Sequence, residues 1–92
     1  MYKIKSRQFK NAKKLGVTLK PSKSKAKKID VFKNGKQIAS IGGRGYKDYA
    51  TYISERGLEY ANKRKKLYKQ RHENDRKVKG SNGYYADKIL WS

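Results

Sequence analysis

The stretch IGGRGYK, residues 41–47, is the first group whose residue types and spacing could do chemistry. A glycine-rich loop between a strand and a helix exposes backbone N–H groups that can hold a phosphate. The Gly-Lys-Ser/Thr end of a Walker loop is absent, however, and Asp48 stands where a dinucleotide-binding loop has its third small residue. One interpretation is a structural corner that needs positive φ or a close approach at Gly42, Gly43 and Gly45. The other is an anion site that adds the side chains of Arg44 and Lys47.

His72 is the only histidine, and Glu73 and Asp75 follow it closely. One imidazole with two carboxylates near the end of a helix does not supply the convergent groups of a metal site or a general-base pair. The sequence also has no cysteine and no recognisable nucleophile motif. We therefore expect no enzymatic activity, no metal and no cofactor, and a structural or surface role for His72.

The run NKRKKLYKQR, residues 62–71, has six basic residues in ten, which cannot all share one face of a helix. It is either a solvated helix surface or a helix that follows phosphates. Eight tyrosines accompany the charge, but no RNP-type pattern is present, so composition supports only nonspecific contact with nucleic acid. The candidate contacts to nucleic acid or another anion are Arg44, Lys47, Lys63, Arg64, Lys65 and Lys66.

The charge balance limits the partners that these residues can have. The chain has 92 residues, with 26 Lys and Arg against 7 Asp and Glu, a net charge of +19. Counterion release makes polyanions favourable ligands for such a chain, and its length allows one domain with a small core. The longest apolar run, Ile89-Leu90-Trp91, is far too short to span a membrane.

The first third of the chain concentrates this charge, with eleven basic residues and no acid in residues 1–28. We predict an extended basic arm over residues 1–27, because the segment has little apolar surface with which to fold alone. Val17 and Leu19 alternate as in a short strand, so the arm can lie along another surface. The arm residues expected to bind a partner are Lys3, Lys5, Arg7, Phe9, Lys13, Lys14, Val17 and Leu19.

Residues 28–92 are predicted to form a small α+β domain that begins with a β-hairpin over residues 28–41. Asn34-Gly35 between two β-rich runs is a type I′ turn signal and gives strands at about 28–33 and 36–41. With a two-residue turn, Val31 would oppose Ile38. Both faces of the hairpin carry apolar residues, so we expect a third strand or a helix to cover one face.

Two or three helices should follow the hairpin. Asp48 can cap a helix at about 48–54, and Ser54 can cap a second one that spans about 55–73. Gly57 weakens the first turn of the second helix. A third helix is expected at about 84–91, where Tyr85 and Trp91 are further candidate contacts to a partner, with Trp91 docked either in the domain's own core or in a neighbour.

From residue 29 onward the chain contains the motifs G-Y-x-D-Y, E-R…Y…R-H-x-x-E and I-L-W, here Gly45, Tyr46, Asp48 and Tyr49; Glu55, Arg56, Tyr60, Arg71, His72 and Glu73; and Ile89, Leu90 and Trp91. In these motifs it resembles a family of small basic proteins encoded by large nucleocytoplasmic DNA viruses. The resemblance implies a viral origin. Small basic proteins of such viruses commonly lie beneath the major shell of the capsid or accompany the packaged genome.

We therefore expect a virion structural protein, a minor capsid or cement component of a large double-stranded DNA virus. The protein would be made in the cytoplasm of the host cell and bind capsid proteins in the virion. The alternative is a nonspecific DNA-binding protein that condenses the genome, because acidic protein surfaces and phosphate backbones attract the same lysines.

Overall fold

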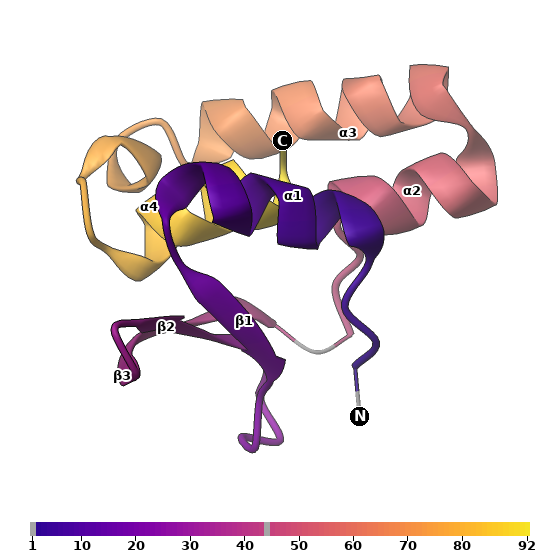
Figure 1. The fold of residues 1–92 in the computed structure, drawn as a ribbon. Helices are drawn as coiled ribbons and strands as arrows, with labels where there is room; N and C mark the ends of the chain where they lie inside the picture. Colours follow the sequence, from indigo (N-terminus) through magenta and orange to yellow (C-terminus); the bar gives the residue numbers. More distant parts are fainter. Residues whose placement is uncertain (1, 44) are drawn as a thin grey trace.

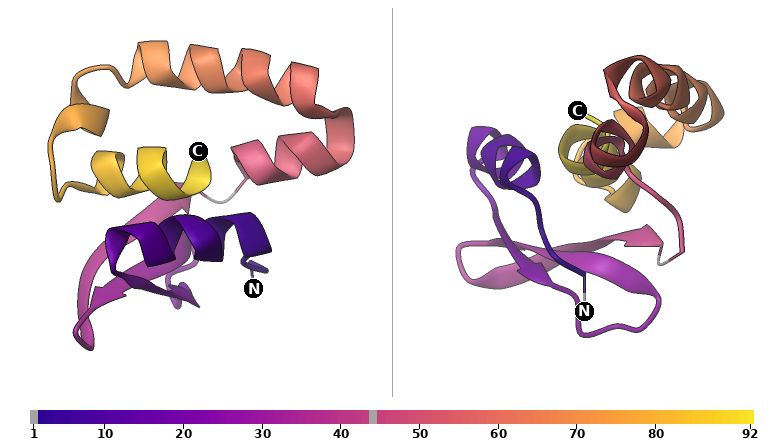
Figure 2. Two further views of the ribbon diagram at one scale, coloured as in Figure 1. Left: turned by 45° about the horizontal axis from the view of Figure 1, so that its top comes forward. Right: turned by 90° about the vertical axis from the view of Figure 1, so that its right-hand side faces the viewer.

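The computed structural model describes residues 2–43 and 45–92 and confirms the α+β class. A three-stranded antiparallel sheet in the order β1-β2-β3 forms one layer (Figure 1). Its strands are β1 (Thr18–Pro21), β2 (Lys27–Lys33) and β3 (Lys36–Gly43). The helices lie over one side of this sheet, and both views in Figure 2 show the N-terminal helix beside the C-terminal one.

The predicted hairpin is confirmed. Asn34 and Gly35 both have positive φ, 53° and 78°, as a type I′ turn requires, and Lys33 pairs with Lys36. A β-bulge between Val31 and Phe32 shifts the register beyond this point. The predicted pairing of Val31 with Ile38 is therefore wrong, and Val31 pairs with Ala39 instead.

The predicted extended arm is wrong, because the N-terminal residues are part of the fold. Residues Ser6–Leu15 form helix α1, and the next residues form β1, which pairs with β2 from Thr18↔Phe32 to Pro21↔Ile29. β1 is the third strand that the apolar faces of the hairpin required. A boundary at residue 27 would divide this sheet, so residues 1–27 are not a separate arm.

Two helices follow the sheet, α2 (Tyr49–Arg56) and α3 (Leu58–Arg71). Asp48 caps α2 as predicted, accepting a hydrogen bond from the Thr51 backbone N–H at 3.0 Å. Ser54 is not the cap of α3, since its hydroxyl lies inside α2 and donates to the Ala50 carbonyl. Gly57, with φ of 88°, separates the two helices instead.

The C-terminal segment returns across the sheet. The 3₁₀ turn η1 (Asp75–Lys77) leads into α4 (Asn82–Tyr85), which continues as the π-helical turn η2 (Ala86–Leu90). The helix predicted at 84–91 therefore exists but begins earlier, where the Ser81 hydroxyl accepts a hydrogen bond from the Tyr84 N–H. This segment packs against α1, β3 and η1.

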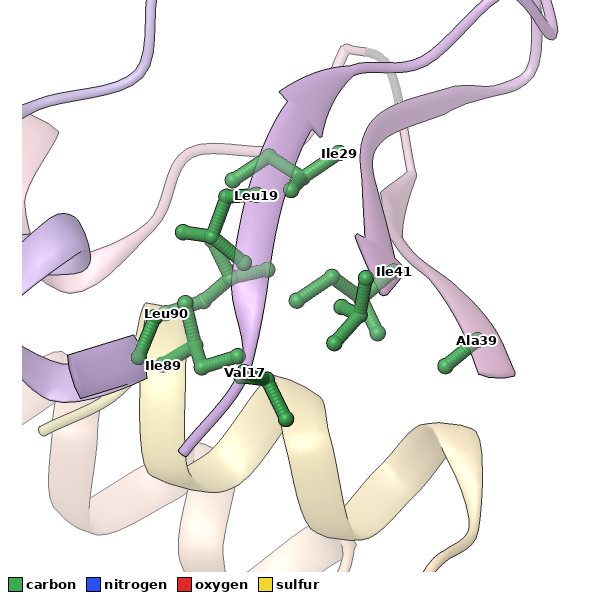
Figure 3. Close-up of a cluster of buried hydrophobic side chains, with 9 residues drawn as sticks. Val17, Leu19, Ile29, Ala39, Ile41, Ile89 and Leu90 are labelled. Atoms are coloured by element: carbon green, nitrogen blue, oxygen red, sulfur yellow. The ribbon is translucent and has the colours of Figure 1, made fainter. Parts of the chain in front are cut away.

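The core lies between the sheet and the two terminal helices (Figure 3). Its fully buried members from the sheet are Ile29, Val31 and Ile41, and η2 adds Ile89 and Leu90. The cluster also contains Ala12, Val17, Leu19 and Ala39. The N-terminal third thus supplies three of the buried core residues, which explains why it is folded rather than extended.

No helix among the described residues is long and apolar enough to cross a membrane.

Candidate functional site

Three of the seven carboxylates of this protein lie inside the fold. Asp30, Asp48 and Asp87 are buried, and Lys28 is the one buried cation among the described residues. In residues 2–43 the only carboxylate is the buried Asp30, so the exposed charge of α1 and the sheet is entirely positive. The fold therefore enhances the cationic character that composition alone predicts.

Asp48 joins three distant parts of the chain. It accepts a hydrogen bond from the Tyr2 hydroxyl at 2.6 Å, and the Lys28 ammonium lies 3.3 Å from the same carboxylate. Burial acts to raise the pKa of Asp48, but the hydrogen bonds from Tyr2 and Thr51 and the charge of Lys28 outweigh it, so this pKa lies below its usual value. Lys28 also donates to the Tyr46 carbonyl, which fixes the β3–α2 loop.

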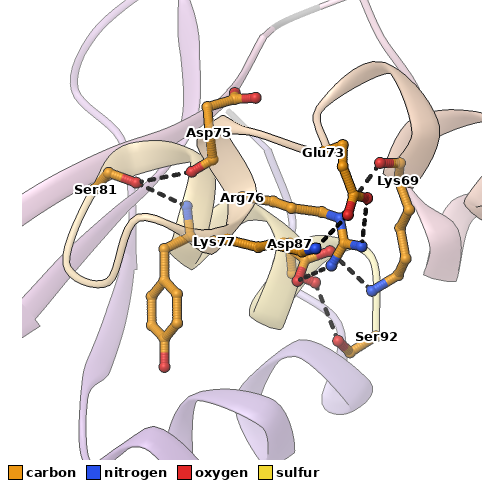
Figure 4. A network of polar contacts seen from close by, with 9 residues as sticks. Lys69, Glu73, Asp75, Arg76, Lys77, Ser81, Asp87 and Ser92 are labelled. Carbon is orange, nitrogen blue, oxygen red and sulfur yellow. Dashed lines mark hydrogen bonds and ion pairs between the residues drawn. The ribbon is translucent and has the colours of Figure 1, made fainter.

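Asp87 holds the C-terminal segment to α3 (Figure 4). Its Oδ1 accepts a hydrogen bond from Lys69 Nζ at 2.8 Å, and its Oδ2 lies 4.0 Å from Arg76 Nη1. Arg76 also donates to Glu73, and the Ser92 hydroxyl donates to the Asp87 backbone carbonyl. These contacts use four charged side chains within the fold, so they are structural.

The outer side of α1 is a continuous basic surface. Its exposed cations at helical spacing border a hollow of about 550 Å³ together with Asn11. We call these residues the α1 basic face: Arg7, Lys10, Lys13 and Lys14. Asn11 fixes the helix to the C-terminal segment by donating to the Ile89 and Ser92 carbonyls at 3.1 and 3.2 Å.

Arg7 links the α1 basic face to α3. Its guanidinium carbon lies 5.1 Å from the ring centroid of Tyr49, and Lys65 Nζ lies 4.7 Å from the same centroid. Burial and the positive charges of Lys69 and Arg7 lower the pKa of Lys65, although Asp87 opposes this effect. Positive charges from two helices thus repel one another at a place where a polyanion would relieve the repulsion.

A second hollow, which we call the aromatic pocket, has a volume of about 440 Å³. It opens between the β3–α2 loop, α3 and the C-terminal segment, and Asp48 and Lys28 lie in its wall. Its aromatic side chains are Tyr46, Tyr52, Tyr68, His72 and Trp91, and its other cations are Lys47, Arg64 and Arg71. The pocket therefore combines aromatic surface with positive charge.

The glycines of the opening motif shape one wall of the aromatic pocket. Gly42 and Gly45 have φ of 78° and 90°, and a Cβ on Gly43 would lie 3.0 Å from Tyr46 Cδ2. The structural corner is therefore confirmed. Arg44 lies outside the described residues, and Lys47 pairs with Glu55, so the anion site at this loop stays a prediction.

The residues predicted to bind a partner fall into buried, partly buried and exposed groups in the structure. Val17 and Leu19 are in the chain's own core, so they cannot anchor the chain in a groove of another protein. Tyr85 and Trp91 are partly buried against the same core. The remaining candidates are accessible to different degrees: Lys3, Arg7, Phe9, Lys13 and Lys14 are exposed, and Lys5 is half-buried.

The basic side chains of residues 62–71 lie on different faces of α3, as their spacing predicts. Arg64 lines the aromatic pocket, Lys65 lies toward Arg7, and Lys63 and Lys66 are exposed. Sequence reasoning missed Lys10, which completes the α1 basic face, and Arg71 as a pocket residue. The spacing of Arg7, Lys10 and Lys14 on one helical face was the signal that could have identified Lys10. Arg71 could be assigned to the pocket only from the tertiary fold.

His72 and Trp91 both contact Tyr68. The ring centroid of Tyr68 lies 4.4 Å from that of His72 and 4.5 Å from that of Trp91, and both pairs are stacked. Trp91 is therefore docked within its own chain. His72 Nδ1 also lies 3.0 Å from Asp75 Oδ2, and the described residues contain no group of three or more potential metal ligands.

Comparison with known proteins adds one partial match. Residues 17–52 are similar to a family of unknown function, DUF5754. The matched segment contains the three strands, the glycine loop and the first half of α2, which is less than half of the chain. No curated protein and no solved structure matches the chain.

Proposed function

We propose that this protein binds nucleic acid without sequence specificity, with the α1 basic face as the main contact to the phosphate backbone. The observation that carries this proposal is the distribution of charge. Three carboxylates are buried, and the four cations of the α1 basic face are exposed within residues 2–43, where no carboxylate is exposed.

A rigid helix with spaced cations suits a phosphate backbone. Neutralising several phosphates with Lys and Arg releases condensed counterions, which favours binding to any sequence. Arg7 extends the surface toward Lys65 on α3, so one strand can contact cations from both helices. No base-reading arrangement is needed for this mode of binding.

The test compares two variants that each lose three positive charges. One replaces Lys10, Lys13 and Lys14 of the α1 basic face with Gln. The control replaces Lys25, Lys33 and Lys36, which are exposed on the sheet and its connecting loop. Fluorescence anisotropy with a labelled duplex should show affinity reduced on the order of tenfold for the first variant and clearly less for the control. Equal losses in the two variants would refute the role of the α1 basic face.

The minor capsid function and the virion location stay predictions that rest on the resemblance in sequence. The structure removes two of their supports, since Val17 and Leu19 are buried and the N-terminal residues are folded. The predicted contacts to a capsid protein that are exposed are Lys3, Arg7, Phe9, Lys13 and Lys14. Digesting the DNA of opened particles separates the two functions, because a capsid component stays with the shell and a genome-binding protein is released.

A further inference from the structure

We propose that the aromatic pocket binds one unpaired nucleobase together with its phosphate, so that the protein prefers single strands to duplex. This inference rests on the proposed function and deepens it by naming the form of nucleic acid. The pocket lies at the β3–α2 loop, and its chemistry differs from that of the α1 basic face. It adds stacking to an interaction that is otherwise only electrostatic.

The first support is the aromatic surface. Tyr46 is 78% exposed on the loop that borders the pocket, and its ring stacks on no other described aromatic side chain. Trp91 is stacked on Tyr68 with an interplanar angle of 20°, which holds its ring in a fixed orientation. Aromatic rings held on a rigid support are the platforms on which proteins stack bases irrespective of sequence.

The positive charges of the pocket provide the second support. Arg71 is exposed, and its guanidinium makes no hydrogen bond or ion pair with any part of the chain that the structure describes. Arg64 Nε is buried without a hydrogen-bond partner among the described residues, and its guanidinium carbon lies 5.6 Å from the Tyr52 ring centroid. The guanidinium of Arg71 can thus donate to a phosphate or to a base edge, and Arg64 adds positive charge to the pocket wall.

Asp48, the only carboxylate among the described residues of the pocket wall, does not oppose an anion. Asp48 is 1% exposed, and its charge is compensated by Lys28 and by the Tyr2 hydroxyl. Burial, together with Asp87 and Asp75, raises the pKa of Tyr68 to about 12, so its ring adds no negative charge to the pocket even in alkaline buffers near pH 10. The pocket therefore has aromatic walls and a net positive charge at neutral pH.

The size and shape of the pocket favour an unpaired base. Its volume of about 440 Å³ lies within the range of about 300–1,000 Å³ for small-molecule sites. A base in a duplex is stacked and paired, so its faces and edges cannot enter such a hollow. A base in a single strand pays no cost of unpairing and can enter it.

The protein contains its own reporter, since Trp91 is the only tryptophan and lines the pocket. We would measure the emission of Trp91 and, separately, the anisotropy of the label on each of three probes. The probes are oligothymidylate, an abasic deoxyribose-phosphate strand of the same length, and a short duplex. A base stacked in the pocket should quench Trp91. The anisotropy of the label should rise for all three probes, because all three bind. Oligothymidylate should quench the emission of Trp91 far more than the other two probes do.

Variants then locate the effect. Tyr46→Ala and Arg71→Gln change exposed residues of the pocket, and each should weaken oligothymidylate binding on the order of tenfold while affecting duplex binding much less. The matched controls are Phe9→Ala, an exposed aromatic residue on α1, and Lys66→Gln, an exposed cation on α3. Neither control residue lines the pocket, so both should preserve the difference between the strands.

The outcomes separate the two proposals. Binding of oligothymidylate without quenching, or equal quenching by the abasic strand, would overturn the base-binding pocket and leave the proposed function standing. Absence of any anisotropy change with all three probes would overturn the proposed function and the pocket together. Selective quenching that disappears in Tyr46→Ala and Arg71→Gln supports both.

Discussion

Asp48 shows how one residue connects segments that are remote in sequence. It caps α2 through the Thr51 N–H, accepts a hydrogen bond from the Tyr2 hydroxyl, and lies 3.3 Å from the Lys28 ammonium. The capping role was predictable, because Asp before a helix is a common N-cap. The contacts with Tyr2 and Lys28 were not, because no local pattern relates residues so far apart.

We predict that Asp48→Asn lowers the free energy of unfolding at pH 7 by about 3 kcal/mol, because it leaves the buried Lys28 charge uncompensated. The pKa of Asp48 is lower in the folded chain than in the unfolded one. Its contribution is therefore present above about pH 4 and is lost as the pH falls through the folded pKa. Chemical denaturation at pH 7 and pH 3 should show a difference between wild type and variant that shrinks in acid.

The control for this prediction is Asp75→Asn, which makes the same chemical change at a side chain that is 58% exposed. Exposed ion pairs contribute little to stability, so we expect a loss much smaller than that of Asp48→Asn. A loss in Asp48→Asn as small as in this control, or one independent of pH, would contradict the role assigned to Asp48.

At the scale of elements, α1 is where the sequence was most misleading. Its lysines and lack of acids suggested an extended arm, but its inward stripe is Gln8, Ala12 and Leu15, spaced as on a helix. Gln8 and Ala12 contribute little to a hydrophobicity pattern, although both are buried. Gln8 Nε2 donates to the Tyr2 hydroxyl at 2.8 Å, so a polar residue in the stripe is satisfied within the fold.

The place of β1 in the fold can be measured with Leu19→Ala. Leu19 is buried in the core, so the substitution should lower the free energy of unfolding by about 2–4 kcal/mol. Thr18→Ala, the neighbouring exposed position on the same strand, is the control and should change it by less than about 1 kcal/mol. If residues 18–21 were a detached arm, both substitutions would be neutral in a denaturant titration.

Other elements could be predicted because their signals are local. Asn34-Gly35 specifies its own turn, and Asp48 marks the start of α2. The β-bulge between Val31 and Phe32 has no local sequence signal, so the predicted register was wrong. Gly57 was recognised only as a weak point in a helix, whereas its positive φ ends α2, so the helix boundary predicted at Ser54 was wrong. The aromatic pocket draws its walls from separate segments, which places it beyond pattern reading.

At the scale of the whole molecule, repulsion within a net charge of +19 opposes folding, and only a small core stabilises the folded chain against it. The fold responds by burying Asp30, Asp48 and Asp87, each with an internal partner. This arrangement stabilises the interior and leaves the positive charge outside. Self-repulsion among these cations is the physical reason to expect that a bound polyanion, or added salt, stabilises the folded chain.

The salt dependence of duplex binding tests the central claim most directly. We would measure affinity for one duplex across a salt series for the wild type, the variant that lacks Lys10, Lys13 and Lys14, and the control that lacks Lys25, Lys33 and Lys36. The logarithm of the binding constant should fall linearly with that of the salt concentration, with a slope of about −0.9 for each phosphate neutralised. The α1 variant should have a slope shallower by about 3 than the wild type, and the control should change it by less than about 1. Binding that is insensitive to salt, or a control slope as shallow as that of the α1 variant, would contradict the account.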